Sequence, residues 1–394
     1  MYKRQDPDQA VKDLVKSAFG HSGQKCSAAS VAIVEASVYD NPAFLRQLKD
    51  AAASLKVGGS WEVSSVVTPL IKEPEGDLLR ALTQLEPGEE WLLKPEPSED
   101  NPCLWSPGIR LGVKPGSWFH QTECFGPVLG IIRAENLEEA IDIQNDSEFG
   151  LTGGLQSLDE REIALWKSKV QVGNAYINRV ITGAIVRRQP FGGWNHSSMG
   201  PGSKAGGPNY LTMLGSWEEK ALPQKLRTPG ERITGLVEKL CSELPDCAKR
   251  IRSAAGSQAK WWMEEFGVEH DPSHIYGENN TFRYVPVKGI LARVENMSDA
   301  DAAILLLGAK LCGAALHLSV EEGHPWIQKM NGYYASLTVE TEAELIDRMP
   351  EAAQGVKFLR GTGISEALAN AARARDVEVL DRPVLALSLI HISE

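Results

Sequence analysis

A cysteine among small residues is the first candidate for chemistry in this chain. Cys26 lies in "HSGQKCSAAS" (residues 21–30), directly after Lys25 and between a predicted helix and a predicted strand. Glycine lets backbone approach a ligand closely, and a neighbouring ammonium group favours the thiolate that attacks an electrophile. The residues alone leave two interpretations open, a catalytic nucleophile or a small residue buried in a crowded turn.

Two further segments combine polar or aromatic residues with turn-forming ones. Glu123 and Phe125 lie in "QTECFGPVLG" (residues 121–130). This motif predicts a rigid turn that presents a carboxylate and an aromatic face. Alternatively, Glu123 is a solvated glutamate on a loop. The segment "QPFGGWNHSSMGPGSKAGGPNYL" (residues 189–211) is rich in glycine and proline. Long irregular loops in compact domains are usually functional or disordered, and its aromatic residues argue against disorder. It has no G-x-G-x-x-G after a strand, so it is not a dinucleotide fingerprint.

Helices and strands alternate around these segments. Helical spacing of apolar residues predicts helices over residues 8–19, 41–55, 137–145 and 159–169. Short apolar or strand-like stretches predict strands over residues 29–36, 129–133 and 173–179. This alternation is typical of an α/β fold with a mostly parallel sheet.

The pattern restarts after a polar segment with two prolines, residues 215–233, which we interpret as a linker. Two helical patterns follow it, and then strands are expected over residues 289–294, 314–320, 333–339, 356–361 and 377–380. Helices are expected between them over residues 299–311, 343–353 and 366–375. We therefore expect a first domain over residues 6–217, a linker and helical segment over 218–279, and a second α/β domain over 280–386.

Composition excludes several classes of function. The net charge of −11 and the pI near 5.4 argue against a nucleic-acid partner, which requires a basic face. Six cysteines without C-x-x-C spacing exclude the common zinc patterns, so no metal is expected. No apolar run approaches the ~18 residues of a membrane span, and no signal peptide opens the chain. A reduced, cytoplasmic setting is the simplest expectation.

Taken together, the motifs resemble a known family. "GQKCSAAS", "ECFGPV", "GNAYINR" and "QPFGG" occur in the order and approximate spacing of the aldehyde dehydrogenases. "GAIVRRQPFGG" followed by "SKAGGPNYL" resembles the L-glutamate γ-semialdehyde (1-pyrroline-5-carboxylate) dehydrogenases, especially the bifunctional proline utilization A flavoenzymes. The resemblance covers about residues 8–217 and implies a Rossmann-like catalytic domain with a parallel sheet. The remainder resembles the α/β, aldehyde-dehydrogenase-like C-terminal domain of the longer proline utilization A proteins.

The resemblance implies a role for each matching residue. Cys26 matches the nucleophile that attacks the aldehyde to form a thiohemiacetal, and its backbone N–H matches half of the oxyanion hole. Hydride then passes to NAD, and water hydrolyses the thioester. Glu123 matches the carboxylate that binds the nicotinamide ribose, and Phe125 matches the ring beside it. Ser27, Gly206 and Gly207 match positions that bind the α-carboxylate of the substrate, a task suited to exposed glycine N–H groups.

The resemblance also implies a parent enzyme longer than this chain. The family's general-base glutamate, oxyanion-hole asparagine and most of its NAD-binding domain lie upstream of the cysteine motif. A proline dehydrogenase domain with FAD would lie further upstream. Residues 1–5, "MYKRQ", and 387–394, "LSLIHISE", resemble translated transposase adapters, so we expect both to be artefacts. The chain is then an inactive excerpt of an enzyme that oxidises L-glutamate γ-semialdehyde to L-glutamate, in the second step of proline catabolism, as a homo-oligomer.

Two alternatives remain open at this stage. An aldehyde dehydrogenase for another substrate would carry the same cysteine, although Ser27 and the "SKAGGP" loop favour a substrate with a carboxylate. A non-catalytic scaffold would keep the fold without the chemistry, against which the intact Cys26 and Glu123 argue. The residues also leave the preference between NAD and NADP open.

Overall fold

A computed structural model describes residues 6–186, 188–198, 204–216, 218, 221–223, 225, 227–326, 332–382 and 384–385. It divides into two compact units, each described here by itself. The first holds residues 6–198 and Lys204–Gly206, and the described part of the second begins at Gly207. Residues 1–5 and 387–394, the expected artefacts, lie outside the described residues. The domain limits at residues 217, 279 and 386 stay predictions.

The first unit is built on a four-stranded sheet in the order β1-β4-β3-β2. Its strands are β1 (Val31–Glu35), β4 (Val128–Ala134), β3 (Gly108–Leu111) and β2 (Glu90–Leu93). β4 runs parallel to both of its neighbours, and β2 closes the edge antiparallel to β3. β4 is a nearly continuous apolar run, as expected for a strand that is covered on both faces.

Alternate residues of β4 face two separate cores. Leu129 and Ile131 pack with α1 (Pro7–Phe19) and α3 (Pro42–Ala53). Val128 and Ile132 pack with the other helices of this unit's sheet, namely α4 (Gly76–Thr83), α5 (Trp118–Gln121) and α6 (Leu137–Asn145). The two-residue period of the strand therefore fixes which helices cover which face.

The rest of the first unit carries two small strand pairs. α7 (Glu160–Lys169) connects β6 (Thr152–Leu155) to its parallel partner β7 (Asn174–Ile177). β5 (Phe149–Gly150) pairs antiparallel with β8 (Trp194–Asn195). The indole of Trp166, buried on α7, donates to Gln144 Oε1 of α6 at 2.8 Å, which joins these strands to the helix layer.

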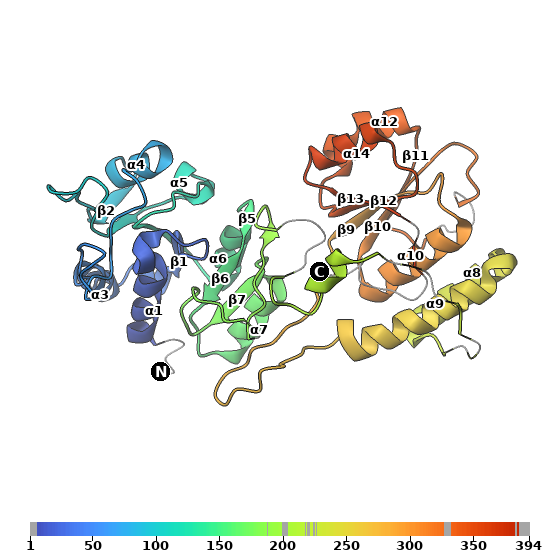
Figure 1. The fold of residues 1–394 in the computed structure, drawn as a ribbon, viewed down its shortest axis with the longest axis horizontal. Helices are drawn as coiled ribbons and strands as arrows, with labels where there is room; N and C mark the ends of the chain where they lie inside the picture. The colour runs from blue at the N-terminus through green and yellow to red at the C-terminus, as the bar shows by residue number, and fades with distance from the viewer. Residues whose placement is uncertain are drawn as a thin grey trace. The chain divides into compact units, whose positions relative to one another are not determined.

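The second unit is a five-stranded parallel sheet in the order β11-β10-β9-β12-β13. The strands are β9 (Gly289–Arg293), β10 (Ala315–Val320), β11 (Ser336–Val339), β12 (Phe358–Gly361) and β13 (Glu378–Asp381). Figure 1 shows α10 (Asp299–Cys312) on one face, and α12 (Glu342–Asp347) and α14 (Glu366–Arg373) on the other. α8 (Glu231–Glu243) and α9 (Ala248–Trp261) pack on α10. From β9 the chain adds β10 and β11 on one side of the sheet, and then returns to add β12 and β13 on the other side of β9. This change in strand order is typical of doubly wound folds.

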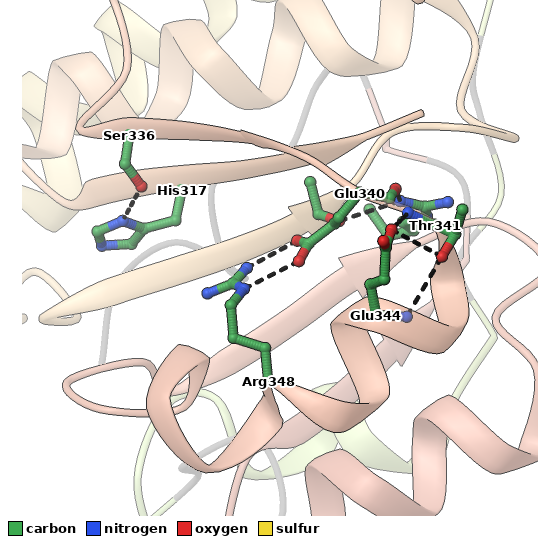
Figure 2. A network of polar contacts seen from close by, with 8 residues as sticks. His317, Ser336, Glu340, Thr341, Glu344 and Arg348 are labelled. Carbon is green, nitrogen blue, oxygen red and sulfur yellow. Dashed lines mark hydrogen bonds and ion pairs between the residues drawn. The ribbon is translucent and has the colours of Figure 1, made fainter. Parts of the chain in front are cut away.

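A polar network fastens the edge strand β11 to this sheet (Figure 2). Arg348 donates to both carboxylate oxygens of Glu340, at 2.9 and 2.7 Å. The buried Arg293 donates to Ser319 Oγ at 3.0 Å and to the carbonyl oxygen of Glu340 at 2.8 Å. These charge-assisted bonds hold Glu340, the residue that follows β11, by both its backbone carbonyl and its side chain.

The expected fold class is confirmed, and the expected helices and strands are present within a few residues. One prediction was wrong, because residues 343–353 form two short helices, α12 and α13 (Met349–Ala352), rather than one. Pro350 lies in the first turn of α13, where a missing N–H is tolerated, and it cannot continue the preceding helix. α8 begins at Glu231, within the segment expected to be a linker. Among the described residues, no helix is long and apolar enough to span a membrane.

Candidate active site

Cys26 lies in a tight turn between α1 and β1. The turn opens with three consecutive left-handed residues, His21 (φ 58°), Ser22 (φ 57°) and Gly23 (φ 68°). Cys26 is exposed, whereas Ser27 next to it is only 4% exposed. Non-glycine residues in the left-handed region cost on the order of 1–3 kcal/mol each, so the surroundings must hold this conformation.

Ser22 and Gly23 supply part of that support. The Ser22 hydroxyl donates to the carbonyl oxygen of Thr68 at 2.6 Å and accepts from the Thr68 N–H at 2.8 Å. Gly23 packs on the backbone of Gly126, and a β-carbon at Gly23 would overlap the Gly126 carbonyl oxygen. The turn that carries Cys26 therefore lies directly against the turn that follows Glu123.

Gln24 ties the same two turns together through its side chain. Its Nε2 donates to the carbonyl oxygen of Phe125 at 3.2 Å, and its Oε1 accepts from the N–H of Ile71 at 3.0 Å. The structure thus brings together the predicted nucleophile segment and the predicted cofactor segment, which lie about a hundred residues apart in sequence. We did not predict a role for Gln24, although it lies within the "GQKCSAAS" motif.

Glu123 and Phe125 are both exposed, while Cys124 between them is buried. Phe125 adopts a left-handed conformation (φ 57°) and leaves 42% of its surface exposed. Burial raises the pKa of the Cys124 thiol to about 12, so this thiol stays protonated at neutral pH. The turn therefore offers a carboxylate and an aromatic ring to solvent and keeps its own cysteine buried and protonated.

His120 supports the segment just before Glu123. Its Nδ1 accepts from the Gly116 N–H at 3.0 Å, so its Nε2 carries the proton and donates to the carbonyl oxygen of Ile143 at 3.1 Å. Burial lowers the pKa of His120, which favours the neutral ring that this arrangement needs. The sequence offered no signal for this role beyond a single histidine.

Side-chain bonds continue from the Cys26 turn to the glycine-rich loop. Thr152 Oγ1 donates to the carbonyl oxygen of Ser27 at 3.4 Å, and Thr152 pairs with Asn174 across β6 and β7. Asn174 Nδ2 donates to the Pro190 carbonyl oxygen at 3.0 Å, and its Oδ1 accepts from the Gly192 N–H at 3.2 Å. The "GNAYINR" and "QPFGG" motifs are therefore in contact.

Lys204 holds the part of the glycine-rich segment (residues 189–211) that directly precedes Gly206. Its Nζ donates to the carbonyl oxygens of Gly173 at 2.5 Å and Gly192 at 2.8 Å, and Ala205 forms a β-bridge with Phe191. Gly206 follows in an exposed left-handed conformation (φ 72°).

The predicted site residues fall into both units. The first unit holds Cys26, Ser27, Glu123, Phe125 and Gly206, whereas Gly207 belongs to the second. Within the described ranges, no group of three or more His, Cys, Asp or Glu side chains could hold a metal ion.

Comparison with known proteins agrees with this geometry. Residues 1–216, more than half of the chain, match the aldehyde dehydrogenase family. The chain is 37% identical over 212 residues to 1-pyrroline-5-carboxylate dehydrogenase from Geobacillus sp. (strain WCH70), covering 54% of this chain and 40% of that protein. The Bacillus subtilis (strain 168) protein of the same name matches with the same identity and coverage. The chain thus spans about two fifths of the length of these curated relatives.

One solved structure is similar over nearly the whole chain. Proline utilization A (PutA) from Corynebacterium freiburgense is 43% identical, with a TM-score of 0.81, and the match covers 99% of this chain and 37% of that one. The similarity therefore extends through the second unit. With the fold, the apposed turns and the family match in agreement, the chain belongs to the aldehyde dehydrogenase family.

Proposed function

We propose that this chain supplies the nucleophile turn and the cofactor turn for NAD-dependent oxidation of L-glutamate γ-semialdehyde to L-glutamate. The observation that carries the proposal is the exposed Cys26 in a turn tied to the turn of Glu123 and Phe125. The relatives named 1-pyrroline-5-carboxylate dehydrogenase support the choice of substrate.

The chemistry of the proposal begins at the Cys26 sulfur. The thiolate attacks the aldehyde carbon, a C–S bond forms, and the carbonyl oxygen takes up the negative charge, which the Cys26 backbone N–H stabilises. Loss of hydride from the same carbon leaves a thioester on Cys26. Water then attacks the thioester, which releases the carboxylic acid and restores the thiol. When bound, NAD supplies the two-electron acceptor.

The turn at Glu123 fits the cofactor in this proposal. Its carboxylate is an exposed acceptor suited to a pair of ribose hydroxyl donors, and Phe125 offers an exposed flat apolar face beside it. Because Cys124 is buried and protonated, it does not compete with Cys26 for the aldehyde. The two turns can thus place the sulfur and the cofactor near the same carbon atom. Holding reacting groups in a productive orientation lowers the activation free energy of the reaction.

The substrate carboxylate is assigned to Ser27 and Gly206 of the first unit, while Gly207, which the resemblance also implies, belongs to the second unit. Exposed glycine N–H groups bind a carboxylate without steric hindrance, and Lys204 holds the loop that ends at Gly206. We also propose that the reaction is the second step of proline catabolism, with a proline dehydrogenase domain as partner, since the similarity to PutA extends over 99% of this chain.

Turnover by the complete encoded protein, read from its source DNA through both ends of this chain, tests the proposal. NADH formation is followed at 340 nm with 1-pyrroline-5-carboxylate and with aldehydes that have or lack an α-carboxylate. We expect turnover with NAD, a strong preference for the α-carboxylate, and loss of turnover in Cys26→Ala with NAD binding retained. Equal rates for both kinds of aldehyde would replace the substrate assignment, and turnover by Cys26→Ala would remove the nucleophile assignment.

A further inference from the structure

We propose that Gln24 is a positioning residue, whose side-chain amide sets the spacing between the Cys26 turn and the turn of Glu123 and Phe125. This inference rests on the proposed function, because it concerns how the nucleophile and the cofactor segment are held together. Gln24 is no catalytic residue in this proposal, since both of its amide atoms bond to protein backbone.

The amide of Gln24 uses its donor and its acceptor on different segments. Nε2 donates to the carbonyl oxygen of Phe125 at 3.2 Å, and Oε1 accepts from the Ile71 N–H at 3.0 Å. The two partners lie 101 and 47 residues away along the chain. One side chain, two residues before Cys26, therefore connects three separate segments around the proposed site.

The backbone conformations on both sides of this connection are strained. His21 and Ser22 precede Gln24 in the left-handed region, and Phe125, which receives its hydrogen bond, is left-handed as well. Such conformations persist only where surrounding contacts fix them. The contact of Gly23 with Gly126 keeps the two turns from moving closer. The Gln24 bond to Phe125 keeps them from moving apart, so the pair of contacts defines one spacing.

Two substitutions separate the functions of the amide. Gln24→Glu keeps an oxygen acceptor for the Ile71 N–H but loses the donor to Phe125, whereas Gln24→Met has similar length and loses both bonds. Gln47→Met is the matched control, because Gln47 lies on α3 of the same unit and donates to Asp8 Oδ1 of α1 at 2.7 Å, a residue in neither turn.

The first measurement follows the hydrogen bond from the Ile71 N–H to Gln24 Oε1 in the 394-residue chain. We expect hydrogen exchange at the Ile71 amide to accelerate about tenfold in Gln24→Met and to stay near the parent rate in Gln24→Glu and Gln47→Met. Alkylation of Cys26 by iodoacetamide without cofactor, followed by peptide mass spectrometry, should change less than about twofold in all three, because the thiol remains exposed. Unchanged Ile71 exchange in Gln24→Met would show that the Gln24 amide does not hold the Ile71 N–H, and would overturn the connection of three segments on which the proposal rests.

The second measurement follows the consequence for the reaction in the complete encoded protein. We expect both Gln24 variants to lower kcat about tenfold and to raise KM for NAD more than KM for the aldehyde, since hydride transfer depends on the spacing of the two turns. If Cys26 alkylation and turnover fall by the same factor, Gln24 has only a general structural role. If kcat and KM are unchanged, the proposal that Gln24 sets the spacing of the two turns is overturned. If the complete encoded protein without substitutions shows no turnover, the proposed function is contradicted instead. Ile71 exchange still tests the hydrogen bond of Gln24 in that case.

Discussion

Gly23 and Gly126 lie backbone against backbone, so close that a β-carbon on Gly23 would overlap the carbonyl oxygen of Gly126. This contact joins the segment of the exposed cysteine to the segment of the exposed glutamate and phenylalanine. Gly23 is left-handed (φ 68°), so conformation and space both require glycine at this position. The arrangement of the proposed site therefore depends on a residue that takes no part in its chemistry.

Gly23→Ala is expected to lower the free energy of unfolding by about 2–4 kcal/mol, because a strained φ and a backbone overlap add together. Urea unfolding followed by tryptophan fluorescence measures this change. Gly59→Ala is the control, since a β-carbon at Gly59 meets nothing within 4 Å, and it should stay within about 0.5 kcal/mol of the parent. Equal stability of the two variants would show that the turns can separate without cost.

The two cysteines near the proposed site are expected to react very differently. At neutral pH, iodoacetamide should modify the exposed Cys26 and leave Cys124 unmodified, because burial raises the pKa of Cys124 to about 12. Peptide mass spectrometry between pH 6 and 9 measures both rates in one sample. Rapid modification of Cys124 in the folded protein would show that this segment opens.

The raised pKa of Cys124 also determines the direction in which the free energy of unfolding changes with pH. Its pKa rises from 9.0 in the free thiol to about 12 in the folded chain, so the unfolded state loses its proton first. The stabilisation by the neutral thiol is complete below pH 9 and declines as the pH rises toward 12. Cys124→Ala should make the fall in stability above pH 9 shallower, with a remaining slope from Cys312, whose pKa burial also raises to about 12.

The sequence predicts those parts of the fold in which the buried positions are occupied by apolar residues. β4 is apolar on both faces, and the strands of the second unit alternate regularly with helices. β3 was missed because its central residue, Arg110, is fully buried, where it pairs with Glu89 and lies 4.6 Å from the Phe119 ring centroid. A charged residue in a central strand breaks the apolar pattern, although its partners make the burial possible.

Within the candidate site, residue types were predictable and contacts were not. Cys26 lies in a turn between a helix and a strand, and Glu123 is exposed before a strand, as the motifs predicted, whereas the roles of both residues stay predictions. The bond from Gln24 to Phe125 joins residues 101 positions apart, a separation that no local period encodes. β6 was also missed, because its two glycines weaken the strand signal and only pairing with β7 reveals it.

Lys204 is expected to affect binding of the aldehyde more than the chemical step. Lys204→Met removes the bonds to the carbonyl oxygens of Gly173 and Gly192, which hold the loop that ends at Gly206. KM for the aldehyde should rise about tenfold in the complete encoded protein, while alkylation of Cys26 stays unchanged. Lys49→Met, on the exposed side of α3, is the control for loss of one positive charge. A rise in KM of the same size in both variants would assign the effect to charge alone.

His120 is expected to make the segment before Glu123 sensitive to acid. Burial lowers the pKa of His120 below 6.5, so the unfolded chain takes up a proton first as the pH falls. The stabilisation by the neutral ring is complete above pH 6.5 and is lost as the pH falls through the lower folded pKa. Protonation would also turn Nδ1 into a donor, facing the Gly116 N–H that it now accepts from.

His120→Gln should therefore lower stability by about 1–3 kcal/mol at pH 7.5, because it leaves a buried backbone group unpaired. The same substitution should make the loss of stability below pH 6.5 shallower than in the unsubstituted chain. Urea unfolding at four pH values measures both effects, and His317→Gln is run beside it because burial lowers the pKa of His317 too. If His120→Gln shifts stability equally at every pH, the side chain acts through packing alone. A shallower slope in His120→Gln would place a proton-sensitive contact three residues before Glu123, and cofactor binding should then weaken in acid before the rest of the first unit unfolds.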